Sequence, residues 1–146
     1  MRLPANNIDL VSINCVNPSE GVAVIKHCQK YFNFGKSILL THEKISVDTI
    51  DVNPIDKLTW DGYNNLILSL TDYSSNDYVM IVQDDGYIVN PDLWDDEYLN
   101  YDYIGAPWPT EDSWVKQQSN TVQKYVIKNR IGNGGFSLRS KKFLEF

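Results

Sequence analysis

The stretch IDLVSINCVNPSEGVAVIKHCQKYFNFGKSILLTH, residues 8–42, decides the fold class of this chain. Its two ends, residues 8–16 and 36–42, are short apolar runs of the kind that form strands buried on both faces of a sheet. The segment between them has apolar residues at helical spacing. A strand, a helix and a strand in this order predict a βαβ unit with parallel strands and a right-handed crossover.

The helix expected between these strands is marked at both ends. Ser19 is expected to cap its start, because a serine side chain can accept a hydrogen bond from the free backbone N–H groups there. Gly35 is expected to end it, because glycine adopts the left-handed backbone that closes many helices. The predicted buried face consists of Val22, Ile25, Cys28 and Phe32.

Further segments extend this pattern along the chain. Residues 60–70, WDGYNNLILSL, predict a second helix whose buried face carries Trp60, Tyr63, Leu66, Ile67 and Leu70. Residues 77–83, DYVMIVQ, predict a third buried strand. The expected fold is α/β: a mixed, mainly parallel sheet flanked by helices in a single domain over residues 1–146. Shorter strands are expected within 45–55, at 101–104 as an edge strand, and at 125–127.

Composition excludes several classes of protein. The 146 residues carry a net charge of -6, which argues against a nucleic-acid-binding module with its basic surface. Cys15 and Cys28 lack the spacing of a zinc site and are expected to be reduced. The chain has no apolar run long enough to span a membrane and no signal-peptide core at its start, so we expect no membrane span and a cytoplasmic protein.

Asp84 and Asp85 directly follow the third predicted strand and directly precede Gly86. One interpretation is a hairpin turn, since Asp-Gly between apolar runs is a strong turn signal and both residues tolerate a positive φ. The other is a metal site, because paired carboxylates are hard oxygen ligands for Mg²⁺ or Mn²⁺. Open α/β sheets bind ligands at the carboxyl ends of their strands, where this pair is expected to lie.

A second unusual segment is NRIGNGGFSLRSKKF, residues 129–143. Its glycines could mark a tight turn before a strand at 136–138, or expose backbone amides to a ligand. The segment fits neither a P-loop nor a dinucleotide-binding motif. Trp108, between two prolines, could pack under a loop or form a stacking wall for a sugar or a base.

Four segments together resemble a glycosyltransferase-like family of the GT-A type. They are WDGYNNLIL (60–68), IVQDDGYI (81–88), YDYIGAPWP (101–109) and IGNGGFSLRSKKFL (131–144), in the order in which the family has them. The resemblance covers about the last 90 residues. It implies a nucleotide-binding α/β fold whose acidic motif, usually written DxD, holds a divalent cation against the diphosphate of a nucleotide sugar.

The resemblance also implies a set of site residues. Asp85 matches the last acid of the DxD motif and Asp84 its middle position, so both are expected to bind Mn²⁺ or Mg²⁺. Gln83 stands where many relatives have the first acid, which leaves one position with an amide. Arg139, although typical of a surface charge when taken singly, is expected to contact the donor. The other donor-binding residues implied are Ser12, Asn14, Tyr63, Asn64, Trp108, Asn133, Gly134 and Gly135.

The function that the resemblance implies is metal-dependent transfer of a sugar from a nucleotide-sugar donor to an acceptor. The catalytic base is not located in this chain, and the part of the fold that binds the acceptor is expected to be largely missing after Phe146. A second hypothesis is a non-catalytic GT-A-like module that binds a nucleotide or a sugar. A third, a nucleotidyltransferase, would require a glycine-rich phosphate loop after the first strand, which NCVNPSEG (14–21) does not supply.

Overall fold

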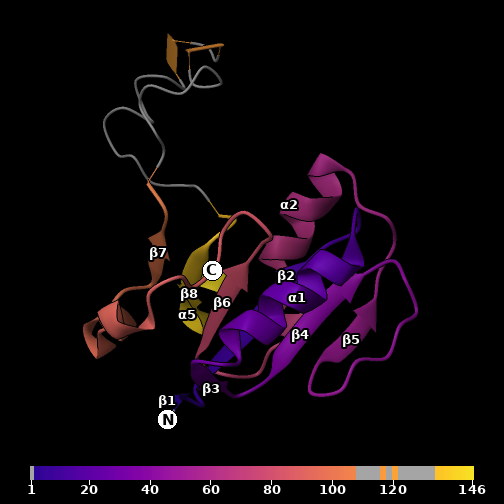
Figure 1. The fold of residues 1–146 in the computed structure, drawn as a ribbon. Helices are drawn as coiled ribbons and strands as arrows, with labels where there is room; N and C mark the ends of the chain where they lie inside the picture. Colours follow the sequence, from indigo (N-terminus) through magenta and orange to yellow (C-terminus); the bar gives the residue numbers. More distant parts are fainter. Residues whose placement is uncertain (1, 108–115, 118–119, 122–133) are drawn as a thin grey trace.

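The computed structural model describes residues 2–107, 116–117, 120–121 and 134–146 (Figure 1). These residues form a mixed α/β fold with one main sheet, as the sequence predicts. Four of the predicted strands are confirmed as β2, β4, β5 and β6, and the predicted edge strand as β7. The elements are β1 (Leu3–Ala5), β2 (Ile8–Ile13), α1 (Pro18–Cys28), β3 (Phe32–Phe34), β4 (Ser37–Thr41), β5 (Asp51–Pro54), α2 (Trp60–Leu68), η1 (Leu70–Asp72), β6 (Tyr78–Val82), η2 (Pro91–Leu93), η3 (Asp96–Asn100), β7 (Tyr103–Gly105), β8 (Ser137–Ser140) and α5 (Lys141–Leu144).

The main sheet has six strands in the order β5-β4-β2-β6-β8-β7. Strands β5, β4, β2 and β6 are parallel, while β8 runs antiparallel to both of its neighbours, β6 and β7. Strands β1 and β3 form a separate parallel pair. The strand predicted at 125–127 lies outside the described residues.

Both faces of the main sheet are covered, which explains why its central strands are almost continuously apolar. On one face, Leu10 and Met80 belong to a core cluster with Ile25 of α1. On the other, Val11 and Ile81 belong to a second cluster that includes Ile67 of α2. Strand side chains alternate between the two faces, so each of these strands contributes to both clusters. In Figure 1, α1 lies across the sheet on the side of the viewer.

Helix α1 begins and ends differently from the prediction. Asn17 occupies the N-cap position and Pro18 the first turn, so Ser19 is not the cap. The helix ends at Cys28 because the chain then turns into β3, which pairs with β1. Gly35 does not end the helix: a Cβ there would lie 2.6 Å from the carbonyl oxygen of Asn6, so glycine allows a close backbone approach instead.

Helix α2 is confirmed, with the side chain of Thr59 accepting a hydrogen bond from the N–H of Gly62 at its start. Its expected face is only partly correct. Ile67 is buried in the core, but Trp60 is 83% exposed and does not belong to the packed face. The first turn of α2 therefore extends beyond the part of the sheet that the helix covers.

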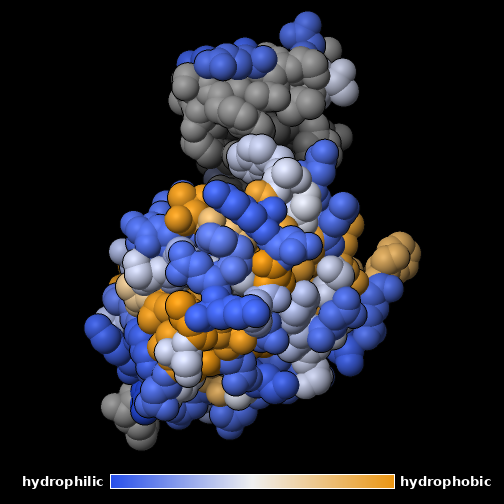
Figure 2. All heavy atoms as spheres, turned by 90° about the vertical axis from the view of Figure 1, so that its right-hand side faces the viewer, coloured by the Kyte–Doolittle hydropathy of each residue, from blue (hydrophilic) through white to orange (hydrophobic). Residues whose placement is uncertain are grey.

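Apolar surface is distributed in patches between hydrophilic residues on the side of the molecule nearest β5, as Figure 2 shows. Within the described residues, no helix has the length and apolar character needed to cross a membrane.

Candidate functional site

The candidate site lies at the edge of the sheet where the parallel strands end. Strand β6 leads directly into a turn, Asp84-Asp85, which Gln83 and Gly86 close by reciprocal backbone hydrogen bonds of 2.9 and 3.1 Å. The predicted turn is therefore present, and both aspartates are exposed. Neither adopts a positive φ, since Thr49 is the only non-glycine residue in the described ranges that does. The turn thus forms without the left-handed backbone expected of Asp-Gly.

The two carboxylates of this turn have different surroundings. Asp84 lines a groove of about 410 Å³ together with Glu20 and His27 of α1. Asp85 acts electrostatically on Tyr63 of α2, which packs on the opposite face of the sheet. The two carboxylates therefore have different neighbours: α1 beside Asp84, and Tyr63 of α2 within electrostatic reach of Asp85.

Tyr63 brings several polar groups of this edge together. The side-chain amide of Gln83 donates a hydrogen bond to the Tyr63 hydroxyl, with 3.0 Å between Nε2 and Oη. Burial raises the pKa of Tyr63, the positive charge of Arg139 lowers it, and the negative charge of Asp85 raises it again. The phenol therefore stays protonated at neutral pH and lies within electrostatic reach of both charges. We refer to Tyr63, Gln83, Asp85 and Arg139 as the edge cluster.

Arg139 of β8 is the most deeply buried charge in the edge cluster. It is only 7% exposed, so the surface position expected for a single basic residue here is wrong. Burial lowers the pKa of Arg139, because loss of hydration disfavours its charged form. Its Nε donates to Oγ of Ser137 at 3.2 Å, and no carboxylate of the described residues forms an ion pair with it. A buried cation is costly unless acceptors or an anion compensate it.

Two neighbours determine where the guanidinium of Arg139 lies. Tyr103 of β7 is directly opposite Arg139 in the strand register, and its ring centre lies 5.3 Å from Cζ, a cation–π distance. Gly134 leaves space for the side chain, since a Cβ there would lie 2.6 Å from Nη2. Tyr103 was not among the predicted site residues. The alternation of Ser137 and Arg139 with apolar residues places both polar side chains on one face of β8, but it does not identify the residue opposite them on β7.

The remaining predicted donor residues lie around this edge in different settings. Ser12 is buried on β2 next to Gly21, and a Cβ added to Gly21 would lie 3.3 Å from Oγ of Ser12. Asn14 accepts hydrogen bonds from the N–H groups of Val16 and Asn17 at 3.0 and 2.8 Å, and so shapes the loop before α1. Asn64 is exposed on α2.

The segment before β8 is described only in part. Gly134 and Gly135 are half-buried, and the carbonyl of Gly134 accepts a hydrogen bond of 3.0 Å from Oγ of Ser137. Trp108 and Asn133 lie outside the described residues, so their predicted roles stay predictions.

The protein side chains at this edge do not form a closed metal cage. Within the described ranges, no three His, Cys, Asp or Glu side chains gather closely enough to hold an ion. The exposed carboxylate of Asp85 is nevertheless a hard oxygen donor that suits Mn²⁺ or Mg²⁺. One exposed carboxylate supplies a single ligand, so the binding of Mn²⁺ or Mg²⁺ by Asp84 and Asp85 stays a prediction.

Comparisons with known proteins bear on the family and on the fold. The model of a family described as "Protein of unknown function (DUF5672)" matches residues 44–146, which contain the whole edge cluster. No curated protein matches the sequence.

Among solved structures, the fold is similar to that of the mannosyltransferase PcManGT from Pyrobaculum calidifontis, determined in complex with GDP-Man and Mn²⁺. The TM-score is 0.54 and the sequence identity 8%. The similarity covers 99% of this chain and 48% of that one, so this chain spans about half the length of the mannosyltransferase. At this identity the likeness concerns the fold alone.

Proposed function

Since this chain belongs to the DUF5672 family of proteins of unknown function, we propose its activity from the edge cluster: it binds a nucleotide sugar and transfers the glycosyl group to an acceptor. In this proposal the fold is GT-A-like and residues 1–146 form the donor-binding part of a glycosyltransferase. The mainly parallel sheet supports it, as does the fold similarity to a mannosyltransferase solved with GDP-Man and Mn²⁺.

One observation carries the proposal: Arg139 is a buried guanidinium with no carboxylate partner among the described residues. Its guanidinium and the carboxylate of Asp85 both act electrostatically on Tyr63, although the strand register pairs Arg139 with Val79 near the start of β6. Guanidinium groups bind phosphate through charge-assisted hydrogen bonds, and a diphosphate would supply an anion for Arg139. Tyr63, protonated because burial raises its pKa, could donate a further hydrogen bond to the same group.

Glycosyl transfer explains why opposite charges are needed at one edge. The bond between the anomeric carbon and the phosphate oxygen breaks, a bond from that carbon to an acceptor oxygen forms, and the acceptor proton passes to a base. Negative charge builds on the departing diphosphate, where Arg139 would stabilise it. A divalent cation bound by Asp85 would neutralise the same phosphate oxygens.

Other predicted donor residues have supporting parts in this proposal. The half-buried backbone of Gly134 and Gly135 would let a sugar lie close to the chain. Asn64 is exposed and free to reach a ligand. The side-chain oxygen Oδ1 of Asn14 already accepts hydrogen bonds from the loop before α1. Asn14 would therefore position that loop rather than bind the donor through the same oxygen.

A second candidate function is binding without turnover. Gln83 stands where a first acid is expected by resemblance, and its amide is already bonded to Tyr63. An amide that donates to a phenol supplies no charge to a metal, so this observation favours a module that binds a nucleotide or a sugar but does not catalyse transfer.

The test is release of nucleoside diphosphate from a panel of UDP- and GDP-sugars in the presence of Mn²⁺. The proposal predicts release by the wild-type protein and its loss in Asp85→Asn, with the circular dichroism spectrum unchanged. Asp72→Asn, which removes another exposed carboxylate from η1, before the start of β6 and at the opposite end of that strand from Asp85, is the matched control and should keep full activity. Binding of the donor without release would support the module instead.

A further inference from the structure

An apolar cavity of the described residues lies on the α1 face of the sheet, between the main sheet and the segment of η2 and η3. Its volume is about 420 Å³. Met80, Leu138 and Ile104 form its floor, and they lie side by side because the strand register pairs Met80 with Leu138 and Ile104 with Leu138. The walls are mainly aromatic: Phe32, Tyr87, Trp94, Tyr98 and Phe136.

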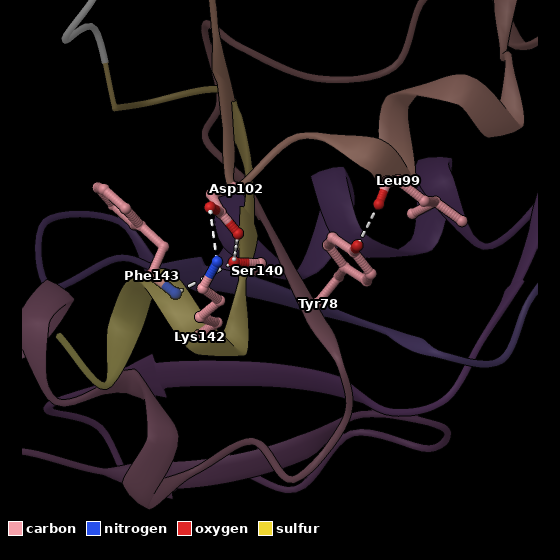
Figure 3. Close-up of polar contacts among 6 residues, drawn as sticks. All are labelled: Tyr78, Leu99, Asp102, Ser140, Lys142 and Phe143. Carbon is pink, nitrogen blue, oxygen red and sulfur yellow. Dashed lines mark hydrogen bonds and ion pairs between the residues drawn. The ribbon is translucent and has the colours of Figure 1, made fainter.

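The outer wall of this pocket is fastened to the sheet at the carboxyl end of η3. The hydroxyl of Tyr78 donates to the carbonyl of Leu99, and Oγ of Ser140 donates to Oδ1 of Asp102 at 2.8 Å (Figure 3). Lys142 lies 3.6 Å from the other oxygen of Asp102. In Figure 1 the helical turns drawn in orange beside β7 are held in this way. The pocket is therefore formed in the ligand-free fold.

Aromatic packing adds to the rigidity of the same wall. The ring of Trp94 meets Phe32 edge-on at 5.6 Å and Tyr98 edge-on at 5.5 Å. These distances lie in the favourable range for aromatic pairs. Leu93, in contrast, is 68% exposed at the rim. A pocket with packed walls and an exposed apolar rim is suited to the apolar part of a ligand.

The segment that forms the outer wall of this pocket is strongly acidic, although its carboxylates face solvent and do not line the pocket itself. The segment that supplies Leu93, Trp94 and Tyr98 contains four exposed carboxylates and no lysine or arginine. Asp92 and Glu97 make no side-chain hydrogen bond or ion pair within the part of the chain that the structure describes. A ligand with a negatively charged head would be repelled here, whereas a cationic head would be attracted. The four carboxylates are Asp92, Asp95, Asp96 and Glu97.

We propose that this pocket binds a cationic amphiphile, with its apolar tail or ring between the aromatic walls and its positive charge outside the pocket, beside the exposed carboxylates of the outer-wall segment. The pocket also adjoins the turn of the candidate site, because Phe136 is one of its walls and a Cβ on Gly86 would lie 3.0 Å from Cβ of Phe136. The binding of this amphiphile is independent of the proposed function.

The test compares three probes that share one tail: n-octyltrimethylammonium, n-octyl glucoside and n-octyl sulfate, each titrated by calorimetry below its micelle-forming concentration. We expect the cation to bind most tightly and the anion least, with about tenfold between them at low salt and less at high salt. Equal affinities, or tighter binding of the sulfate, would overturn the cationic assignment.

Two pairs of variants locate the binding. Leu93→Ser should weaken the binding of all three probes several-fold. Leu68→Ser, which removes a leucine of matched exposure (69%) from α2, should leave their affinities unchanged. Asp92→Asn should reduce the preference for the cation, and Asp56→Asn, with the same change in net charge, should not. If Leu93→Ser binds the probes as tightly as the wild-type protein does, the assignment to this pocket is overturned.

The same variants separate this inference from the proposed function. Leu93→Ser should bind UDP and GDP as the wild-type protein does. Binding of the octyl cation without binding of any nucleotide would support the pocket and contradict the donor site. Nucleotide binding without binding of any octyl probe would contradict the pocket and leave the donor site standing.

Discussion

The guanidinium of Arg139 and the ring of Tyr103 face each other across neighbouring antiparallel strands, 5.3 Å apart. This contact holds a positive charge under the sheet edge at which β6 delivers Asp85. The ring provides a weak electrostatic partner but no full negative charge. Within the part of the chain that the structure describes, no carboxylate pairs with Arg139, and this property underlies the proposed donor site.

Arg139→Met should separate function from stability. Replacement of a buried charge by an apolar side chain of similar length is often neutral or stabilising, so we expect the free energy of unfolding to stay unchanged or to rise by about 1–2 kcal/mol. Nucleotide affinity should fall by about tenfold or more, since a charge-assisted hydrogen bond is lost. Urea unfolding and calorimetric titration measure the two quantities.

The control for Arg139→Met is Lys142→Met, which removes an 83% exposed cation paired with Asp102. It should alter neither stability nor nucleotide affinity appreciably. A strong loss of stability in Arg139→Met with nucleotide binding intact would mean that Arg139 is a structural residue.

Asp9 gives a prediction about stability alone. Its carboxylate is fully buried and accepts hydrogen bonds from the N–H of Lys36 at 2.7 Å, Oγ of Ser74 at 2.7 Å and Nδ2 of Asn76 at 2.6 Å. Asp9→Ala would leave these donors without their acceptor and should cost about 2–4 kcal/mol in urea unfolding. The exposed-site control, Asp56→Ala, should change stability by less than about 0.5 kcal/mol; an equally small effect of Asp9→Ala would contradict the importance of this network.

Replacement of two helical glycines by alanine should change the stability of the protein in opposite directions. A Cβ on Gly21 of α1 would lie 2.8 Å from Cδ1 of Leu39, so Gly21→Ala should destabilise the protein by about 1–3 kcal/mol through overpacking. A Cβ on Gly62 of α2 would meet its nearest atoms at an ordinary 3.4 Å, so Gly62→Ala should stabilise it by about 0.5–1 kcal/mol through helix propensity. Thermal unfolding of both variants checks the signs, and equal signs would contradict the packing of α1 on β4.

Stability should decline at alkaline pH. Burial raises the pKa of Tyr63 and of Tyr103 above the ordinary value of 10.0, and burial raises the pKa of the Cys28 thiol above 9.0. The folded state then holds these protons more tightly than the unfolded chain, so their stabilising effect is complete below about pH 9 and is lost as the pH rises further. Tyr63→Phe should make the loss smaller, as measured by urea unfolding between pH 8 and pH 11. An identical pH dependence in Tyr63→Phe would contradict the burial of this phenol.

The strands and the fold class were predictable because the central strands are short apolar runs, and segments with apolar residues at helical spacing lie between them. The end of α1 was not predictable, because it depends on the pairing of β3 with β1, which lie far apart in sequence. Gly35 was expected to end the helix, but it lies instead against the buried carboxylate of Asp9. A Cβ on Gly35 would lie 2.9 Å from Oδ1 of Asp9, so only glycine fits this close contact.

The candidate site was predictable in its place but not in its geometry. Asp85 could be located at the end of β6 from sequence, since strand and turn signals coincide there. The burial of Arg139 could not, because it follows from the pairing of β7 with β8 across 31 intervening residues, from 106 to 136. The different surroundings of Asp84 and Asp85 depend on which helix covers each face of the sheet, which no local pattern encodes.

The most direct test of the donor site is calorimetric titration of the wild-type protein with UDP and with GDP, with and without Mn²⁺. We predict micromolar binding of one of them, strengthened by Mn²⁺ and lost in both Asp85→Asn and Arg139→Met. Absence of binding to either nucleotide in both conditions, or binding that both variants retain, would contradict the claim that this edge of the sheet holds a nucleoside diphosphate.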